Sequence, residues 1–246
     1  MSYSVCIILI PKGYLKGKKG GEVDLRDFLY ALNNKVKKQN LKIVVIRNYE
    51  ELPGKRTGSD IDLIIKENDV ALWLGIIERL CNELGLTLIF TKGYYYCTKL
   101  LIKGVDGELE LDLNNRFEWR GIKFSSTDDL IDNAVQYNDC IYTTNKLMGS
   151  YITFQHSFLY GGFINYRYAE MIELLVKNKE WFLSEVEKIG GGALSKDILN
   201  HMRNGTSLTR FEVHLIRLKI IGYQLLRKPL NVLQGLIMSF YCDFFK

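Results

Sequence analysis

The sequence predicts an α+β protein in which a half built from strands and helices, residues 1–140, precedes an all-helical half, residues 141–246. Three observations predict this class. Short β-branched or apolar runs alternate with amphipathic runs in the first half. The segment "ELELDL", residues 108–113, alternates strictly between leucine and an acid, which is typical of a strand with one buried face. From about Thr127 onward the apolar spacing is that of helices.

Caps and periodicity place the individual elements. Asp24 is a helix N-cap, because the apolar residues that follow it share one helical face. The segment "GVDG", residues 104–107, joins two strand-like runs as a hairpin. The helix expected over residues 70–84 has Leu72, Ile76, Ile77 and Leu80 facing inward. Strands are expected at 4–10, 41–46, 60–66, 86–90, 97–103 and 108–113, a loop at 12–21, and further helices at 25–36, 145–160, 166–178, 179–189, 195–203 and 207–226.

Composition and charge exclude several classes of function. The chain of 246 residues carries a net charge of +5, with a pI near 8.8, which suits an anionic partner such as a nucleotide. The basic residues are spread out, so no nucleic-acid partner is expected. Five cysteines without a Cys-x-x-Cys spacing, and three histidines that are not paired, indicate neither a disulfide framework nor a zinc site. We therefore expect a reducing, cytoplasmic compartment.

Two carboxylates stand at the front of an apolar run in "GSDIDLII", residues 58–65. On an extended strand Asp60 and Asp62 point to the same face, with their Cα atoms about 7 Å apart. Carboxylates, waters and substrate phosphates are the usual ligands of Mg²⁺, and two ions can share such a site. An edge strand with two solvated acids is the other interpretation of these residues alone.

A second acidic strand and a basic loop favour the metal site. The strand at 108–113 turns Asp112 and Glu110 to one face, and the residues do not decide which of them is the third carboxylate. The loop before Asp60 contains glycines and polar side chains of the kind that hold phosphates. The candidate nucleotide-binding residues of this segment are Arg47, Asn48, Lys55, Arg56 and Ser59.

The motif "GSDIDLII" resembles the Asp-hydrophobic-Asp core of the nucleotidyltransferase fold, the superfamily that includes DNA polymerase β. The resemblance implies a mixed sheet with flanking helices. It also implies that Asp60 and Asp62 bind Mg²⁺ and the triphosphate, and that Asp112 or Glu110 completes the site. Members of that superfamily carry a Gly-Ser or Gly-Gly pair about ten residues before the acids. Arg47 and Asn48 stand there in this chain, so the phosphate-binding contacts are either made by Arg47, Asn48 and Lys55 or Arg56 instead, or they are lost.

Residues 40–125, with "VIRNYEELP" and "LELDL" followed by "EWRG", resemble a narrower bacterial group of nucleotidyltransferase-like proteins associated with surface-polysaccharide genes. The resemblance implies a sugar or glycoconjugate acceptor and a role in polysaccharide biosynthesis. The expected function is Mg²⁺-dependent transfer of a nucleotidyl or related phosphoryl group from an NTP to a hydroxyl. The alternatives are an inactive nucleotide-binding or scaffold protein of the same fold, and a toxin-like enzyme that modifies RNA or protein.

The C-terminal segment "RKPLNVLQGLIMSFYCDFFK", residues 227–246, is expected to be a helix that is apolar on nearly every side. Its main interpretation is a helix that packs on the helical half or forms a homodimer. The alternative is a helix that rests on a membrane surface, which would make the protein peripheral to the inner membrane.

Overall fold

The computed structural model describes residues 23–94, 96–161, 168–204 and 209–244. The strand expected at 4–10 and the loop at 12–21 lie outside them. The chain divides into two compact units: Met1–Arg116 with Thr127–Thr144, and Phe117–Ser126 with Asn145–Lys246. A mixed sheet with flanking helices forms the first unit, and the second is mainly helical, so the predicted α+β class is confirmed.

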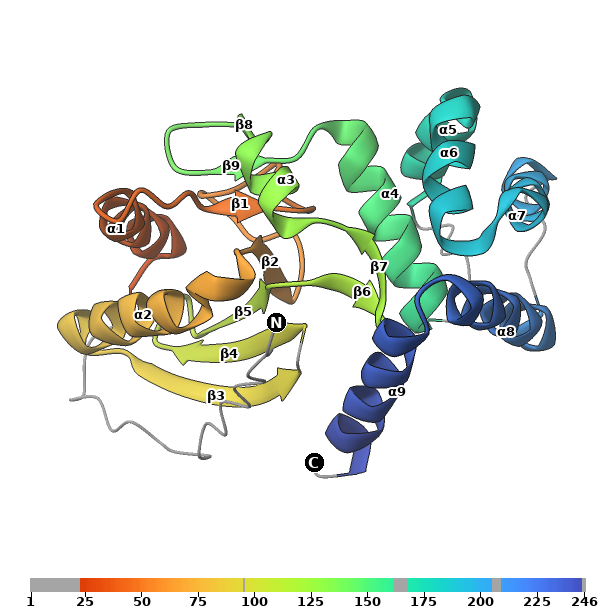
Figure 1. The fold of residues 1–246 in the computed structure, drawn as a ribbon. Coiled ribbons are helices and arrows are strands. Elements are labelled where there is room, and N and C mark those ends of the chain that lie inside the picture. Colours follow the sequence, from red (N-terminus) through yellow and green to blue (C-terminus); the bar gives the residue numbers. More distant parts are fainter. Residues whose placement is uncertain (1–22, 95, 162–167, 205–208, 245–246) are drawn as a thin grey trace. The chain divides into compact units, whose positions relative to one another are not determined.

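In the described part of the first unit, seven strands form a sheet in the order β3-β4-β5-β2-β1-β9-β8, which Figure 1 shows from bottom to top. The strand β2 lies between β5, with which it is parallel, and β1, with which it is antiparallel. The acid-bearing strand is therefore central. The strands are β1 Val44–Val45, β2 Asp60–Ile64, β3 Thr87–Tyr94, β4 Cys97–Lys103, β5 Glu108–Asn114, β8 Val135–Gln136 and β9 Tyr142–Thr143.

The helices α1 (Leu25–Lys37) and α2 (Val70–Leu84) cover one face of this sheet. They form one core with alternate residues of the two central strands, Ile61 and Leu63 on β2 and Leu109, Leu111 and Leu113 on β5. Because side chains alternate along a strand, the acids of β2 and β5 extend from the opposite face. Shorter elements complete the unit: a 3₁₀ turn η1, Glu67–Asp69, and α3, Thr127–Asp132.

Two details of the predicted elements are wrong. Leu72 is 37% exposed, and Trp73, at 1%, is the inward residue of that turn. A step of four residues turns about 40° around a helix, so Leu72 lies at the edge of the face centred on Ile76 and Leu80. The strand expected at 41–46 is only Val44–Val45, although its flanking residue Ile43 is fully buried.

In the second unit a β-hairpin joins the helices. The strands β6 (Phe117–Trp119) and β7 (Ile122–Ser125) turn through Arg120 and Gly121, whose φ angles of 51° and 78° are typical of a type I′ turn. The hairpin contacts α4, α6 and α9. The helices are α4 Lys146–His156, continued by a π-helical turn η2 Ser157–Gly161, then α5 Ala169–Lys177, α6 Lys179–Gly190, α7 Gly192–Asn204, α8 Arg210–Arg227 and α9 Pro229–Phe244.

The observed division differs from the expected boundary at residue 140 in two segments. Residues 141–144 stay with the sheet, because β9 pairs in parallel with β1. Residues 117–126 join the helical unit, because the apolar side chains of the hairpin are buried within it. Each spatial unit is therefore made of two separate stretches of the sequence.

The helix α9 lies against the hairpin turn through two glycines. A Cβ atom on Gly235 would lie 2.0 Å from the Gly121 nitrogen, so only glycine fits this contact. Along the same helix, four large apolar side chains are exposed: Leu230, Leu233, Ile237 and Phe240. None of the helices within the described ranges is long and apolar enough to cross a membrane.

Two of the leucines of α2, Leu72 and Leu80, give a matched test of the core. Leu80→Ala removes a side chain that is 1% exposed, and we expect a loss of about 2–5 kcal/mol in the free energy of unfolding. Leu72→Ala makes the same chemical change on the same helix at a side chain that is 37% exposed, and should cost much less. Urea denaturation followed by far-UV circular dichroism measures both. Equal losses would contradict the assignment of the buried face.

Candidate metal centre

Three carboxylates converge on the face of the sheet opposite α1 and α2. Asp60 and Asp62 are two residues apart on β2, and Asp112 lies beside Asp62 in the parallel register of β2 and β5. One carboxylate oxygen from each acid can be chosen so that all three lie within 4.8 Å of one another. In the part of the chain that the structure describes, this is the one such group of three metal-binding side chains.

Two of these acids are largely buried, since Asp62 is 8% exposed and Asp112 is 6% exposed. Cations from neighbouring segments meet them: Arg47 Nε donates to Asp62 Oδ2 at 2.7 Å, and Lys99 Nζ donates to Asp112 Oδ2. Asn114 Nδ2 donates to Asp62 Oδ1 at 3.4 Å. The centre therefore combines three negative charges with two positive ones.

Burial raises the pKa of the Asp112 carboxyl to about 6. The hydrogen bond and the positive charge of Lys99 oppose this shift, and the charges of Asp62 and Asp60 add to it. For Lys99 itself, burial acts to lower the pKa, but the hydrogen bond to Asp112 and its charge raise it above the ordinary value. Lys99 therefore stays charged at neutral pH, while Asp112 changes its charge at a pH of about 6.

The other expected site residues lie in different places. Glu110 is the register partner of Asp60, but it is exposed and does not belong to the group of three. Ser59 Oγ donates to Asp60 Oδ1 at 3.2 Å, so it lies at the centre. Of the remaining loop residues, Arg56 Nη1 donates to the carbonyl of Glu108 at 3.1 Å.

Two loop residues expected to bind phosphate have other surroundings. The ammonium of Lys55 lies 3.8 Å from Glu51 Oε2, and its side chain is 77% exposed. Asn48 adopts a positive φ of 56°, and its amide nitrogen approaches Gly58, where a Cβ atom would be 3.4 Å away. The structure thus brings Arg47 and Ser59 to the acids, and holds Lys55 and Arg56 through other contacts.

Sequence reasoning missed Lys99 and Asn114. The signal for Lys99 was present in the predicted hairpin, because pairing Lys103 with Glu108 beside the turn places Lys99 opposite Asp112. Asn114 continues the polar face of β5 one step beyond Asp112. The antiparallel register, followed from the turn outward, would have predicted the first of these contacts.

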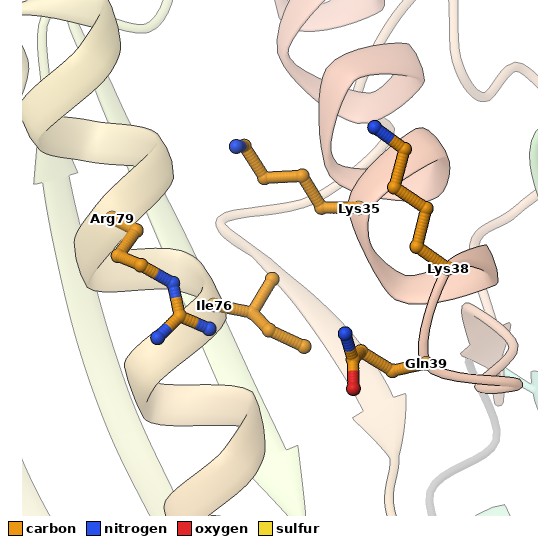
Figure 2. Close-up of a pocket in the computed structure, with 5 residues that line it drawn as sticks. All are labelled: Lys35, Lys38, Gln39, Ile76 and Arg79. Carbon is orange, nitrogen blue, oxygen red and sulfur yellow. The ribbon is translucent and has the colours of Figure 1, made fainter.

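A second feature is a pocket of about 160 Å³ between α1 and α2. Figure 2 shows Lys35 from α1, Lys38 and Gln39 just beyond its end, and Ile76 and Arg79 from α2 around this pocket. Lys35 Nζ is paired with Glu83 Oε2 at 2.7 Å. The pocket lies among the helices that cover the leucine-bearing face, so it is separate from the carboxylates.

Comparisons with protein-family models, with curated proteins and with solved structures give no match for this chain. Support for the centre therefore comes from its donor set. Three carboxylates from adjacent strands offer the oxygen ligands that Mg²⁺, Ca²⁺ and Mn²⁺ prefer, so they fit a hard divalent cation.

The raised pKa of Asp112 predicts a pH-dependent cost in stability. Its pKa is about 6 in the folded protein, against 3.8 for an aspartate side chain in water, so the folded state binds this proton more tightly. Its contribution to stability is full below pH 4 and is lost as the pH rises through 6. Asp112→Asn removes this titration while Lys99 stays charged. The stability of the variant relative to wild type should therefore rise by about 2 kcal/mol between pH 4 and pH 7.

Urea denaturation at a series of pH values in EDTA measures this difference, because groups common to both proteins cancel. The loss of the hydrogen bond from Lys99 adds an offset that does not change over this interval. A difference that is constant with pH, or that falls as the pH rises, would contradict the stated environment of Asp112.

Proposed function

We propose that the chain is a Mg²⁺-dependent, nucleotidyltransferase-like enzyme that moves a nucleotidyl or related phosphoryl group from an NTP to a hydroxyl acceptor. The observation that carries the proposal is the convergence of Asp60, Asp62 and Asp112 from two adjacent strands, with one oxygen of each within 4.8 Å of the others. The Asp-Ile-Asp motif on a central strand, followed by a third acid on its neighbour, supports it.

In this proposal Asp60, Asp62 and Asp112 hold the cation, and waters and phosphate oxygens complete its ligands. When bound, the ion supplies positive charge to the phosphoryl group that is transferred. Asp112 is also the carboxylate that accepts the proton of the acceptor hydroxyl. Arg47 keeps the Asp62 carboxylate in place through its 2.7 Å contact.

The loop of residues 47–59 leads directly into β2, and we propose that it contacts the nucleotide phosphates. Ser59 beside Asp60 supports this, as do the cationic side chains of Lys55 and Arg56 on the same loop. The acceptor is proposed to be a sugar or glycoconjugate precursor, which rests on the sequence resemblance alone.

A second candidate is an inactive nucleotide-binding or scaffold protein of the same fold. The observation that favours it is that Arg47 and Lys99 already contact two of the three acids. Such contacts offset part of the cost of burying an acidic cluster without any ion. In this alternative the protein binds a nucleotide but does not turn it over.

Loss of either acid on β2 should abolish Mg²⁺-dependent nucleotide binding. Calorimetric titration with each NTP in the presence of Mg²⁺ should show affinity weakened at least about tenfold in Asp60→Asn and Asp62→Asn. Glu110→Gln is the matched control, because Glu110 lies beside Asp60 but outside the cluster. Wild-type affinity in either aspartate variant would sink the assignment of the metal ligands.

Release of the leaving group separates the two candidates. Wild-type protein with NTP, Mg²⁺ and a panel of sugar or glycoconjugate acceptors should release pyrophosphate, the leaving group of nucleotidyl transfer, or NDP, the leaving group of phosphoryl transfer, and Asp62→Asn should release neither. Nucleotide binding by the wild type with neither product from any acceptor would favour the scaffold. Release that continues in EDTA would contradict a metal-dependent reaction.

A further inference from the structure

We propose that the ammonium of Lys99 takes the place of a second metal ion, so that the centre binds one divalent cation per chain. The inference rests on the proposed function, because it concerns the same carboxylates. It differs from the two-ion arrangement that a pair of acids on one strand first suggests. Three features of the centre support it: the strand register that places Lys99 beside Asp112, the carboxylate oxygens that the cationic side chains contact, and the net charge of the centre.

The pairing of β4 with β5 places Lys99 beside Asp112. Lys99 on β4 is the antiparallel register partner of Asp112 on β5, so the two side chains extend from the same face of adjacent strands. The side chain of Asp112 is 8% exposed and that of Lys99 is 36% exposed, so the ion pair is partly buried. Partial burial holds the lysine there, because its charge needs a partner away from water.

The cationic side chains and the proposed metal ion contact the same carboxylates. Each carboxylate has two oxygens, and Lys99 and Arg47 each contact the Oδ2 atom of one acid. One ion needs a single oxygen from each acid, which the cluster offers within 4.8 Å. A second ion would need the Oδ2 atom of Asp112, for which it would compete with Lys99.

The net charge of the centre also favours a single divalent cation. Three carboxylates with Arg47 and Lys99 leave one net negative charge, and one divalent cation changes this to one net positive charge. That charge suits a nucleotide phosphate. A second divalent cation would stand close to the ammonium of Lys99, and repulsion between like charges opposes its binding.

Another lysine on the same strand supplies a matched comparison. Lys103 pairs with Glu108 across the same two strands, with Nζ 3.2 Å from Oε1. Its partner does not belong to the carboxylate cluster. A lysine that only stabilises the hairpin would behave like Lys103, whereas Lys99 should change the number of ions bound.

Titration with Mn²⁺, followed by the electron paramagnetic resonance signal of the free ion, counts the ions bound per chain. We expect one in wild type, one in Lys103→Met and one in Lys99→Arg, which keeps the charge. We expect two in Lys99→Met, because Asp112 then has an oxygen free for a second ion. Far-UV circular dichroism checks that each variant is folded.

Two ions in wild type, or one ion in folded Lys99→Met, would overturn the role of Lys99 and leave the metal centre standing. No bound Mn²⁺ in wild type would overturn the proposed centre itself. The wild-type measurement does not depend on the folding of any variant, so the proposal stays testable if Lys99→Met does not fold.

Discussion

The parallel pairing of β2 with β5 is the interaction on which both the core and the candidate site depend. It places Asp62 beside Asp112 on one face, and in the same register it places Ile61 beside Leu111 on the other. A shift of one residue would turn the acids toward α1 and α2 and the apolar side chains away from them. Such a shift would bury uncompensated charge in the core, so the packing of the leucines keeps the carboxylates together.

Electrostatic neutralisation is the second condition for this arrangement. Two of the three acids are less than a tenth exposed, and carboxylates that are so far removed from water are costly unless cations or donors meet them. Arg47 comes from the segment that follows β1, and Lys99 from β4, so two separate parts of the chain supply the compensating charges. The burial that raises the pKa of Asp112 shows that this compensation is incomplete.

Local patterns in the sequence predicted most of the elements. The alternation in residues 108–113, the Asp24 cap and the helix at 70–84 are each determined by neighbouring residues, and the structure agrees with them. The errors arise where tertiary packing, and not the local pattern, decides which side chain is buried. Leu72 is apolar but lies at the edge of its helical face, and only packing decides that Trp73 is buried in its place.

The candidate site was predictable to the extent that it depends on strand alternation. Asp60 and Asp62, with either Asp112 or Glu110, follow from two neighbouring strands with acids on one face. The choice of Asp112 over Glu110 needed the structure, which groups Asp112 and not Glu110 with the two acids of β2. Lys99 depends on the register of a hairpin, and the contacts of Lys55 and Arg56 depend on the path of a loop. Residue types alone do not determine that path, which is why the loop predictions were the weakest.

The membership of the β6–β7 hairpin in the helical unit has a consequence for synthesis of the chain. The hairpin leaves the ribosome before the helices α4, α6 and α9 that it contacts. Its buried side chains, Phe117, Trp119, Ile122 and Phe124, therefore lack their full set of partners until about a hundred more residues have been made. The nascent chain thus exposes an apolar ribbon with unpaired edges during much of its elongation, a state in which aggregation competes with folding.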